Sequence, residues 1–590
     1  RDITNIPMPY VIKLLLGIGS SWFHGGDPLV VLLFDEDLEK IREKALSSKF
    51  FEEYIKKYFL DNPHRVLMVL NPDPEKGKRE AEKERKELEE KRRLLTVSDL
   101  EKIREREETL VILQETKEDL SCLPSLEISD ISREIKKESP DRISEDKKIY
   151  FYDKPTSEIF YFTSLFGTGH LPLELMEYVP LFTFLVPRTG TKKKNYIEFT
   201  RKIDAVTGGF GLSPLVRTSV FDKGSTFSSI SFGAKCLERY QKDMFELVAE
   251  LIRDYSFEDT ARIKSLLLQF RSGLESSVVQ NGHKLAISLA SRNLSPASSL
   301  VELWSGISQL RLVREITDSF DVKESGEKAV SSLKEKLNLI AEMCFNKNNY
   351  KVCMVGGEGN LKAGEEIFSL FSDSLSPQGK DGFVPPPIKE LEKPVREAWT
   401  TQSSVSFVGA ACRVPSFGAP EAPYFSVLSR LLKSNYLHRE IREKGGAYGG
   451  FALYNSEEGI FSCGSYRDPN IKRTIDAFNS GIEFLKKGDF DSDEIKEAIL
   501  QTASDLDKPD TPAASAKKDF FRKILNIPDE KRQEFKERLL ETDRDKLAET
   551  AGKYLKSEAF SNNIAVITGK LPLEKEKPLL KDICLDEKEI

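Results

Sequence analysis

The chain has 590 residues, of which 39% are hydrophobic and 31% are charged, and this composition is typical of a globular protein rather than a collagenous or wholly disordered one. Its 89 basic and 96 acidic residues give a net charge of -7, which argues against general binding to nucleic acid or to anionic membranes. Apolar runs such as Val30–Phe34 fall far short of the ~18 residues that a membrane span needs.

A weak internal repeat organises the chain. Each copy has an amphipathic helix, a short polar turn and an apolar strand that ends in a loop. The three copies are FFEEYIKKYFLDNPHRVLMVLNP (50–72), LKEKLNLIAEMCFNKNNYKVCMVGG (333–357) and KLAETAGKYLKSEAFSNNIAVITG (546–569). The repeat therefore predicts three related structural units, the first with a terminal strand near Val66–Leu70.

A second pattern precedes only the last two copies. An apolar strand (Ile159–Phe166, later Val405–Val414) is followed by an apolar-faced helix, a double glycine and another extended run. The double glycines are Gly208-Gly209 and Gly445-Gly446. The shared order predicts an α+β fold with two tandem homologous sheet-and-helix domains.

These patterns give four expected segments. Residues 1–71 are interpreted as the C-terminal remnant of a preceding homologous domain, which suggests a piece of a longer protein. Residues 72–147 are expected to form a charged helical-hairpin linker, with helical propensity over 75–93 and a capping box at Ser98 and Glu101 that begins the second, antiparallel helix. Residues 148–375 and 376–590 are the two complete domains, joined through the stiff Pro385-Pro386-Pro387 run.

Metal and thiol chemistry find little support in this sequence. The five histidines are His24, His64, His170, His283 and His438, and no two are four residues apart, so a zinc-binding pair on one helix face is excluded. The seven cysteines are scattered without a C-x-x-C motif. We expect no metal site built from this chain alone, and we interpret Cys463 as a core thiol.

One segment, YLHREIREKGGAYGGF (436–451), carries candidate site residues. A helix bearing Arg442 is expected to break at Gly445-Gly446, leaving Tyr448 between glycines ahead of a strand, where another chain could approach closely. A phenol there could donate a hydrogen bond to a carbonyl or an oxyanion, and the guanidinium could bind a peptide carbonyl or carboxylate. Spacing alone favours the alternative, an Arg–Tyr pair that merely stabilises a helix-to-strand corner.

REKGGAYGG (442–450) resembles the C-terminal-half signature of the pitrilysin/insulinase family of zinc metallopeptidases. The motifs HRVLMVLNPDPE (64–75), SCLPSLEISDI (121–131), LPLELMEYVPLF (171–182) and TGGFGLSP (207–214) are similar to the presequence-protease subgroup, and the resemblance runs over nearly the whole chain.

The resemblance implies a four-domain enzyme whose two halves, joined by a helical hairpin, close around a peptide chamber. The family's zinc motif, H-x-x-E-H, is absent from this sequence, so the chain resembles the C-terminal half and the zinc cofactor would be bound by the missing N-terminal half. Arg442 would hold substrate backbone and Tyr448 would stabilise the tetrahedral intermediate, with Gly445, Gly446 and Ala447 also in the substrate-binding segment.

The expected function is therefore part of a metalloendopeptidase that degrades unfolded peptides, inactive as this fragment alone and monomeric when full length. Its expected partners are the N-terminal catalytic half and peptide substrates. The expected location is the cytoplasm in a bacterium, or otherwise the mitochondrial matrix or another organelle lumen. The alternative is a zinc-free peptide-binding or assembly subunit of the same superfamily, and the sequence upstream of Arg1 would distinguish the two.

Overall fold

The computed structural model describes residues 10–71, 73, 75–115, 126–219, 226–388, 393–556 and 559–590. Cys122, residues 116–125 of the expected linker and residues 389–392 after the proline run lie outside the described residues. The chain divides into two compact units, a smaller one over residues 5–125 and a larger one over residues 126–590. No helix in the described ranges is both long enough and apolar enough to cross a membrane.

Helices provide the regular structure of the smaller unit where it is described. They are α1 (Tyr10–Trp22), α2 (Asp35–Ser47), α3 (Phe50–Ile55), its π-helical continuation η2 (Lys56–Leu60), α4 (Lys76–Leu94) and α5 (Val97–Glu115), with a 3-10 turn η1 at Pro28–Val31. The described residues of α2, α3 and α4 include none that is buried. These helices therefore depend on local propensity and on end charges, such as the acidic first turn of α2.

The strand expected at Val66–Leu70 was wrong. These residues form no regular element, and their side chains are 71–91% exposed. A strand is stabilised by hydrogen bonds to a neighbour and by a face that packs on a core. Neither partner is supplied to this segment by the described residues, so its apolar β-branched composition alone does not produce a strand.

The capping residues of α5 were also misplaced by two positions. The amide of Thr96 donates to the Asp99 carboxylate at 2.9 Å, and the amide of Asp99 donates to the Thr96 hydroxyl at 3.3 Å. This reciprocal pair replaces the one expected at Ser98 and Glu101. Two Ser/Thr-x-x-acid patterns overlap here, and the helix begins at the earlier one.

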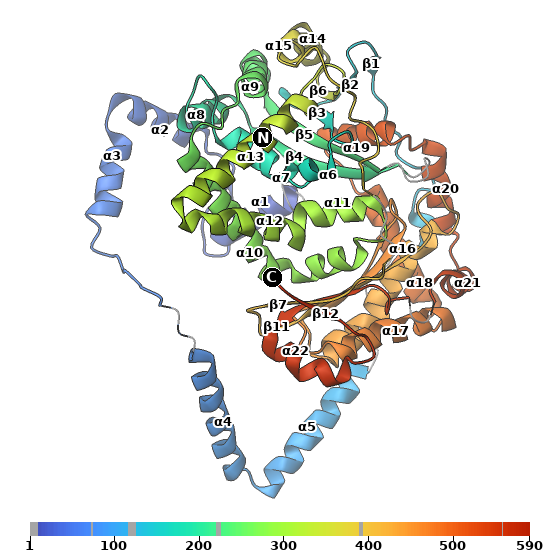
Figure 1. The fold of residues 1–590 in the computed structure, drawn as a ribbon. Coiled ribbons are helices and arrows are strands. Elements are labelled where there is room, and N and C mark those ends of the chain that lie inside the picture. The colour runs from blue at the N-terminus through green and yellow to red at the C-terminus, as the bar shows by residue number, and fades with distance from the viewer. Residues whose placement is uncertain are drawn as a thin grey trace. The chain divides into compact units, whose positions relative to one another are not determined.

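Two six-stranded sheets form the framework of the larger unit (Figure 1). The first sheet contains β1 (Arg142–Ser144), β2 (Ile149–Asp153), β3 (Ile159–Gly167), β4 (Gly209–Thr218), β5 (Thr226–Leu237) and β6 (Lys351–Gly356), in the order β1-β2-β6-β3-β5-β4. The second contains β7 (Arg396–Thr401), β8 (Phe407–Arg413), β9 (Gly449–Asn455), β10 (Ile460–Tyr466), β11 (Ile564–Gly569) and β12 (Asp586–Glu589), in the order β12-β7-β11-β8-β10-β9.

Five strands of each sheet share one topology. The order β2-β6-β3-β5-β4 corresponds to β7-β11-β8-β10-β9, with one parallel pair (β2 with β6, β7 with β11) followed by antiparallel pairs. The sixth strand differs, because β1 is antiparallel to β2 whereas β12 is parallel to β7. The predicted α+β class with two tandem related sheet domains is confirmed. The expected helix–strand pairs are also present, as α13 (Lys323–Cys344) before β6 and α21 (Arg544–Tyr554) before β11.

Helices cover both sheets of the larger unit. Between β3 and β7 in the sequence, the helices are α6 (Leu173–Met176), α7 (Val179–Leu185), α8 (Tyr196–Val206), α9 (Gln241–Asp254), α10 (Thr260–Ser291), α11 (Pro296–Ser305), α12 (Ile307–Asp318), α13 (Lys323–Cys344), α14 (Glu358–Glu366) and α15 (Ser369–Ser372). Around the second sheet they are α16 (Ala422–Leu431), the π-helix η7 (Leu432–Glu443), α17 (Lys472–Lys487), α18 (Ser492–Asp507), α19 (Pro512–Ile524), α20 (Asp529–Leu540), α21 (Arg544–Tyr554) and α22 (Lys570–Glu576).

The larger unit has two halves, one built on each sheet. Each half contributes a helix that packs on the sheet of the other half. The second part of α10, beyond a kink at Asn281, packs on the second sheet, while α19 packs on the first through Ala516 and Phe520. Glycines allow the close approach of α10, since a Cβ at Gly409 would lie 2.4 Å from the backbone of Ala286. This reciprocal packing joins the two sheets and fixes the corner that carries Tyr448.

Candidate functional site

The helix that carries Arg442 is a π-helix, η7, whose inner face packs on the second sheet through the buried side chains of Leu437 and Ile441. It ends in a turn at Gly446, whose φ of +76° is a left-handed conformation that favours glycine. Gly445 is needed for space, because a Cβ there would lie 2.4 Å from the carbonyl oxygen of Ile441. The helix therefore breaks at the double glycine, as the sequence predicts.

Backbone hydrogen bonds hold this corner. Gly446 donates to the Arg442 carbonyl at 3.0 Å, Ala447 to the Ile441 carbonyl at 3.1 Å, and Tyr448 to the Tyr466 carbonyl at 3.0 Å. The sequence suggested that the glycines leave room for another chain, whereas in the structure the corner itself uses that room. The side chains of Arg442 and Tyr448 are thus the groups that can face a ligand.

Tyr448 is a surface phenol held against other aromatic and cationic groups. Its side chain is 71% exposed, and its ring stands edge-on to that of Tyr466, with centroids 6.1 Å apart and planes at 90°. The Arg467 guanidinium lies 5.9 Å from the centre of the Tyr448 ring and 5.5 Å from that of Tyr466. A positive charge beside an exposed phenol favours negative charge nearby.

Tyr466 is itself fixed from below by α10. The His283 ring meets the Tyr466 ring at 5.0 Å and stacks on Phe451 at 5.3 Å. Burial, followed by the neighbouring Lys284, lowers the pKa of His283, so this imidazole is neutral at physiological pH. An uncharged histidine can fill the space between two aromatic rings without the cost of burying a charge.

Arg442 is exposed and oriented by a histidine rather than by Tyr448. Its Nη1 lies 3.2 Å from His438 Nε2, and His438 Nδ1 lies 3.3 Å from Glu443 Oε1. An imidazole with its proton on Nδ1 satisfies both contacts, accepting from the guanidinium and donating to the carboxylate. No hydrogen bond or cation–π contact among the described residues joins Arg442 to Tyr448, which argues against a simple Arg–Tyr corner pair.

The sequence did not reveal His438, Tyr466, Arg467 and His283 as members of this site. His283 comes from a helix of the first half, and Tyr466 and Arg467 follow Tyr448 by a hairpin, so only the fold brings them together. One backbone feature marks Arg467, whose φ of +50° is uncommon outside glycine. Such positive φ values at non-glycine residues cluster at functional sites.

The corresponding corner of the first sheet lacks the phenol. There the amide of Gly208 donates to the carbonyl of Lys235 at 2.9 Å, as Tyr448 does to Tyr466, and the next residues open the edge strands β4 and β9. Gly208 is thus the structural counterpart of Tyr448, so the expected correspondence between the double glycines at 208–209 and 445–446 was wrong. Because the first sheet makes the same backbone hydrogen bond with a glycine, that hydrogen bond does not require a tyrosine.

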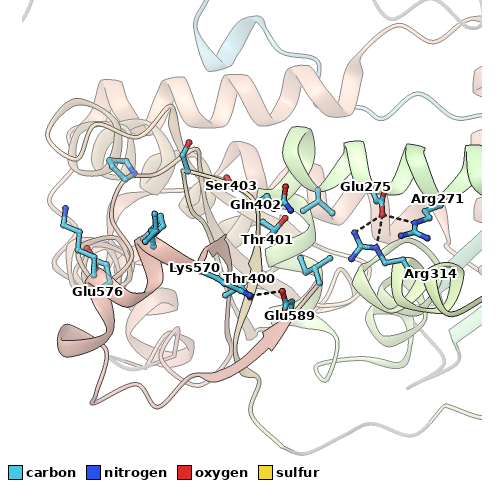
Figure 2. A pocket seen from close by; sticks show the side chains of 17 residues that line it. Arg271, Glu275, Arg314, Thr400, Thr401, Gln402, Ser403, Lys570, Glu576 and Glu589 are labelled. Carbon is cyan, nitrogen blue, oxygen red and sulfur yellow. Dashed lines mark hydrogen bonds and ion pairs between the residues drawn. The ribbon is translucent and has the colours of Figure 1, made fainter. Parts of the chain in front are cut away.

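A cavity of about 1260 Å³ lies near this corner and is lined by parts of α10, α12, β7, α22 and β12 (Figure 2). Pro469 contributes to its wall, and a Cβ at Gly446 would contact that proline ring at 3.7 Å. Within the cavity Glu275 accepts from Arg271 at 3.0 Å and lies 2.8 Å from Arg314. Glu275 therefore bridges the two arginines, and Arg271 also donates to Asp318 at 2.5 Å.

The described residues provide no group of three or more His, Cys, Asp or Glu side chains that could hold a metal ion. A zinc ion therefore does not fit this part of the chain. Cys463, interpreted as a core thiol, is fully buried in β10, and burial raises its pKa.

The sequence matches two family models. Residues 70–316 match the model of a region associated with subfamily C of the M16 peptidases, and residues 396–570 match "PreP C-terminal domain". The second match contains the whole corner from Arg442 to Arg467.

Curated relatives cover almost all of the chain. It is 30% identical over 562 residues to the mitochondrial presequence protease of Danio rerio, covering 91% of this chain and 54% of the relative. It is 31% identical over 551 residues to presequence protease 1, chloroplastic/mitochondrial, of Arabidopsis thaliana, covering 92% and 50%. The chain thus spans about half the length of these relatives.

Solved structures share the fold over most of this chain. A peptidase M16 inactive domain from Pseudomonas fluorescens has a TM-score of 0.50 at 14% identity, covering 72% of this chain and 96% of that one. A conserved protein from Enterococcus faecalis V583 has a TM-score of 0.52 at 14% identity, covering 72% and 98%. At this identity the likeness concerns fold alone.

Proposed function

Since the chain belongs to the presequence-protease branch of the pitrilysin family, we propose that it forms the zinc-free part of a metalloendopeptidase that encloses and degrades unfolded peptides. Its contribution is substrate binding and stabilisation of the transition state. The metal is held by a part of the protein outside this chain. The presequence proteases named above support an organelle, mitochondrion or chloroplast, as the place of action.

The observation that carries this proposal is the exposed phenol of Tyr448. A tyrosine that is 71% exposed contributes little to packing, yet its backbone and ring are both held in place. The related corner of the first sheet forms with Gly208 in its place. A side chain that this backbone hydrogen bond does not need, presented rigidly on the surface, fits a role toward a ligand.

The roles proposed for Tyr448 and Arg442 follow from the hydrogen bonds that their side chains can donate. Attack of water on a peptide carbonyl places negative charge on the carbonyl oxygen, and the Tyr448 hydroxyl donates a hydrogen bond to that oxygen. The fork of Arg442, oriented by His438, holds a neighbouring carbonyl or carboxylate of the peptide. Gly445, Gly446 and Ala447 shape the turn that fixes the direction of both side chains.

Peptide hydrolysis by the full-length protein tests the proposal. The purified 590-residue chain is expected to bind unfolded peptides without cleaving them, and the full-length protein is expected to cleave them. Cleavage by the 590-residue chain alone would contradict the assignment. A full-length protein that binds peptides without cleaving any would favour the alternative, a peptide-binding or assembly subunit.

A further inference from the structure

A second pocket, built from residues other than those of the Tyr448 corner, contains an arginine whose charge is not neutralised. This pocket has a volume of about 740 Å³, within the range of pockets that bind small ligands. It lies between α18, α19 and α20 of the second half and the segment 135–138, which enters the first sheet domain. We name this segment the strap.

Hydrogen bonds hold the strap against α20. The amide of Ile135 donates to Gln533 at 3.0 Å, and Arg532 donates to the carbonyl of Lys136 at 3.1 Å. Lys536, only 1% exposed, donates to the Glu134 carbonyl at 2.9 Å and to both Asp507 oxygens at 2.8 Å. The pocket is therefore a built feature, with walls that do not depend on a ligand.

Arg522 of α19 is the unpaired group. Its partly buried guanidinium lines the pocket and makes no hydrogen bond or ion pair to any residue that the structure describes. Burial, followed by repulsion from Arg532, lowers its pKa. A guanidinium remains charged even so, and a partly desolvated charge without a partner is costly.

The acids around Arg522 already have other partners. Asp519 accepts from Tyr152 at 3.0 Å, Asp529 from Arg532 at 2.6 Å, and Asp510 from Lys518 at 2.7 Å. Glu138, on the strap, accepts from Lys154 at 2.6 Å and from Ser515 at 2.9 Å. A ligand carboxylate would thus meet a free donor fork.

Apolar walls adjoin this charge. Phe417 and Phe535 stack with centroids 5.1 Å apart, and Ile527 and Leu506 complete that side. The main chain of Lys137 on the strap makes no hydrogen bond to another described residue, which leaves it free to pair with an extended peptide. An acidic group next to an apolar side chain and a peptide backbone matches these three features.

We propose that this pocket binds the free C-terminal end of a peptide, with the terminal carboxylate on Arg522 and the last side chain against Phe417 and Phe535. The choice of a peptide rests on the proposed function, whereas the carboxylate rests on the pocket alone. A guanidinium and a carboxylate form two parallel hydrogen bonds, which an amide cannot reproduce.

Direct binding to the 590-residue chain tests this site, using one short peptide with an apolar last residue, made both as the free acid and as the C-terminal amide. Isothermal titration calorimetry should show that the acid binds at least about tenfold more tightly than the amide. Arg522→Gln should abolish that preference, and Arg522→Lys should restore only part of it, because lysine lacks the planar fork. Lys523→Gln, an equal loss of charge at the next position, which does not line the pocket, should retain the preference.

Two further measurements complete the test. Lys508→Glu, at the exposed rim of the pocket, should weaken binding of the acid severalfold even if Arg522→Gln lowers the melting temperature. Equal binding of acid and amide by the unaltered chain would overturn the proposal, as would inorganic phosphate that displaces the acid at equal concentration. Because no cleavage is measured, failure of the proposed enzyme function would show separately, as an inactive full-length protein that still prefers the acid.

Discussion

The rings of Tyr448 and Tyr466 meet edge to face at the start of β9, with centroids 6.1 Å apart, while the amide of Tyr448 donates to the carbonyl of Tyr466 at 3.0 Å. Backbone and side chain are therefore both anchored by the same neighbouring residue. Only the hydroxyl end of Tyr448 remains free to contact a substrate. This arrangement separates the role of the ring from that of the hydroxyl, and the two can be tested individually.

Removal of the Tyr448 hydroxyl should slow peptide cleavage without unfolding the protein. In the full-length enzyme, Tyr448→Phe is expected to lower kcat by about 10²- to 10³-fold with little change in KM, as for loss of one oxyanion donor. Steady-state kinetics on a fluorogenic peptide measure both constants. Tyr466→Phe is the matched control, because its ring supports Tyr448, and it should stay close to wild type. An unchanged kcat in Tyr448→Phe would remove the hydroxyl from the mechanism.

His438 should act as a positioning residue for Arg442. Loss of its 3.2 Å contact in His438→Ala is expected to raise KM about two- to tenfold, the effect of one modest hydrogen bond, with a smaller change in kcat. His438→Gln offers an amide oxygen to the guanidinium and should recover most of the affinity. If Gln behaves like Ala, or if the variants alter kcat alone, Arg442 is not held through His438.

Much of the fold could be predicted because its signals are local. Apolar strands such as Ile564–Gly569 and the amphipathic helices before them carry their own periodicity, and the repeated order reveals two related sheets. The strand expected at Val66–Leu70 failed because pairing depends on a neighbour that the local sequence does not specify. The misplaced cap of α5 arose from two overlapping patterns that only the observed hydrogen bonds distinguish.

The site was predictable only in part, for the same reason. Arg442 and Tyr448 lie near a double glycine, and the sequence predicts that the helix ends at this double glycine. The contacts that orient these side chains could not be predicted. His283 contacts Tyr466 from a position nearly two hundred residues earlier, because α10 belongs to the first half and packs on the second sheet. The unpaired state of Arg522 likewise depends on tertiary contacts, because the neighbouring Asp519 accepts instead from Tyr152, which lies 367 residues away in the sequence.

The conformation of Gly446 should be important to both stability and activity. Its φ of +76° makes Gly446→Ala unfavourable by about 1–2 kcal/mol, because a Cβ is strained in the left-handed region. Gly446→Asn should cost less, since asparagine adopts this region more readily. Thermal unfolding and peptide cleavage are expected to rank the variants alike, Gly above Asn above Ala. Equal melting temperatures for all three would mean that the turn relaxes without strain.

A buried ion pair connects the two halves of the larger unit. Arg292, at the end of α10, donates to Glu397 of β7 at 2.6 and 2.9 Å, and Lys588 and Trp399 donate to the same carboxylate at 2.6 and 3.0 Å. Burial alone raises the pKa of Glu397, but the hydrogen bonds from Arg292, Lys588 and Trp399 outweigh it, so this pKa lies below its ordinary value.

Breaking this pair should destabilise the protein in a pH-dependent way. Arg292→Met is expected to cost about 3 kcal/mol at neutral pH, the lower end for a broken buried pair, because Lys588 and Trp399 remain as donors. A carboxylate with a depressed pKa stabilises the fold fully above the ordinary glutamate pKa and loses that contribution as the pH falls through its lowered value. The difference in melting temperature between wild type and Arg292→Met should therefore shrink as the pH is lowered from 7 toward 3.

The control is Lys328→Met, which removes an exposed ion pair with Glu324 and should change the free energy of unfolding by no more than about 1 kcal/mol at any pH. A constant difference for Arg292→Met across this range would show that its packing, rather than its charge, joins the two halves.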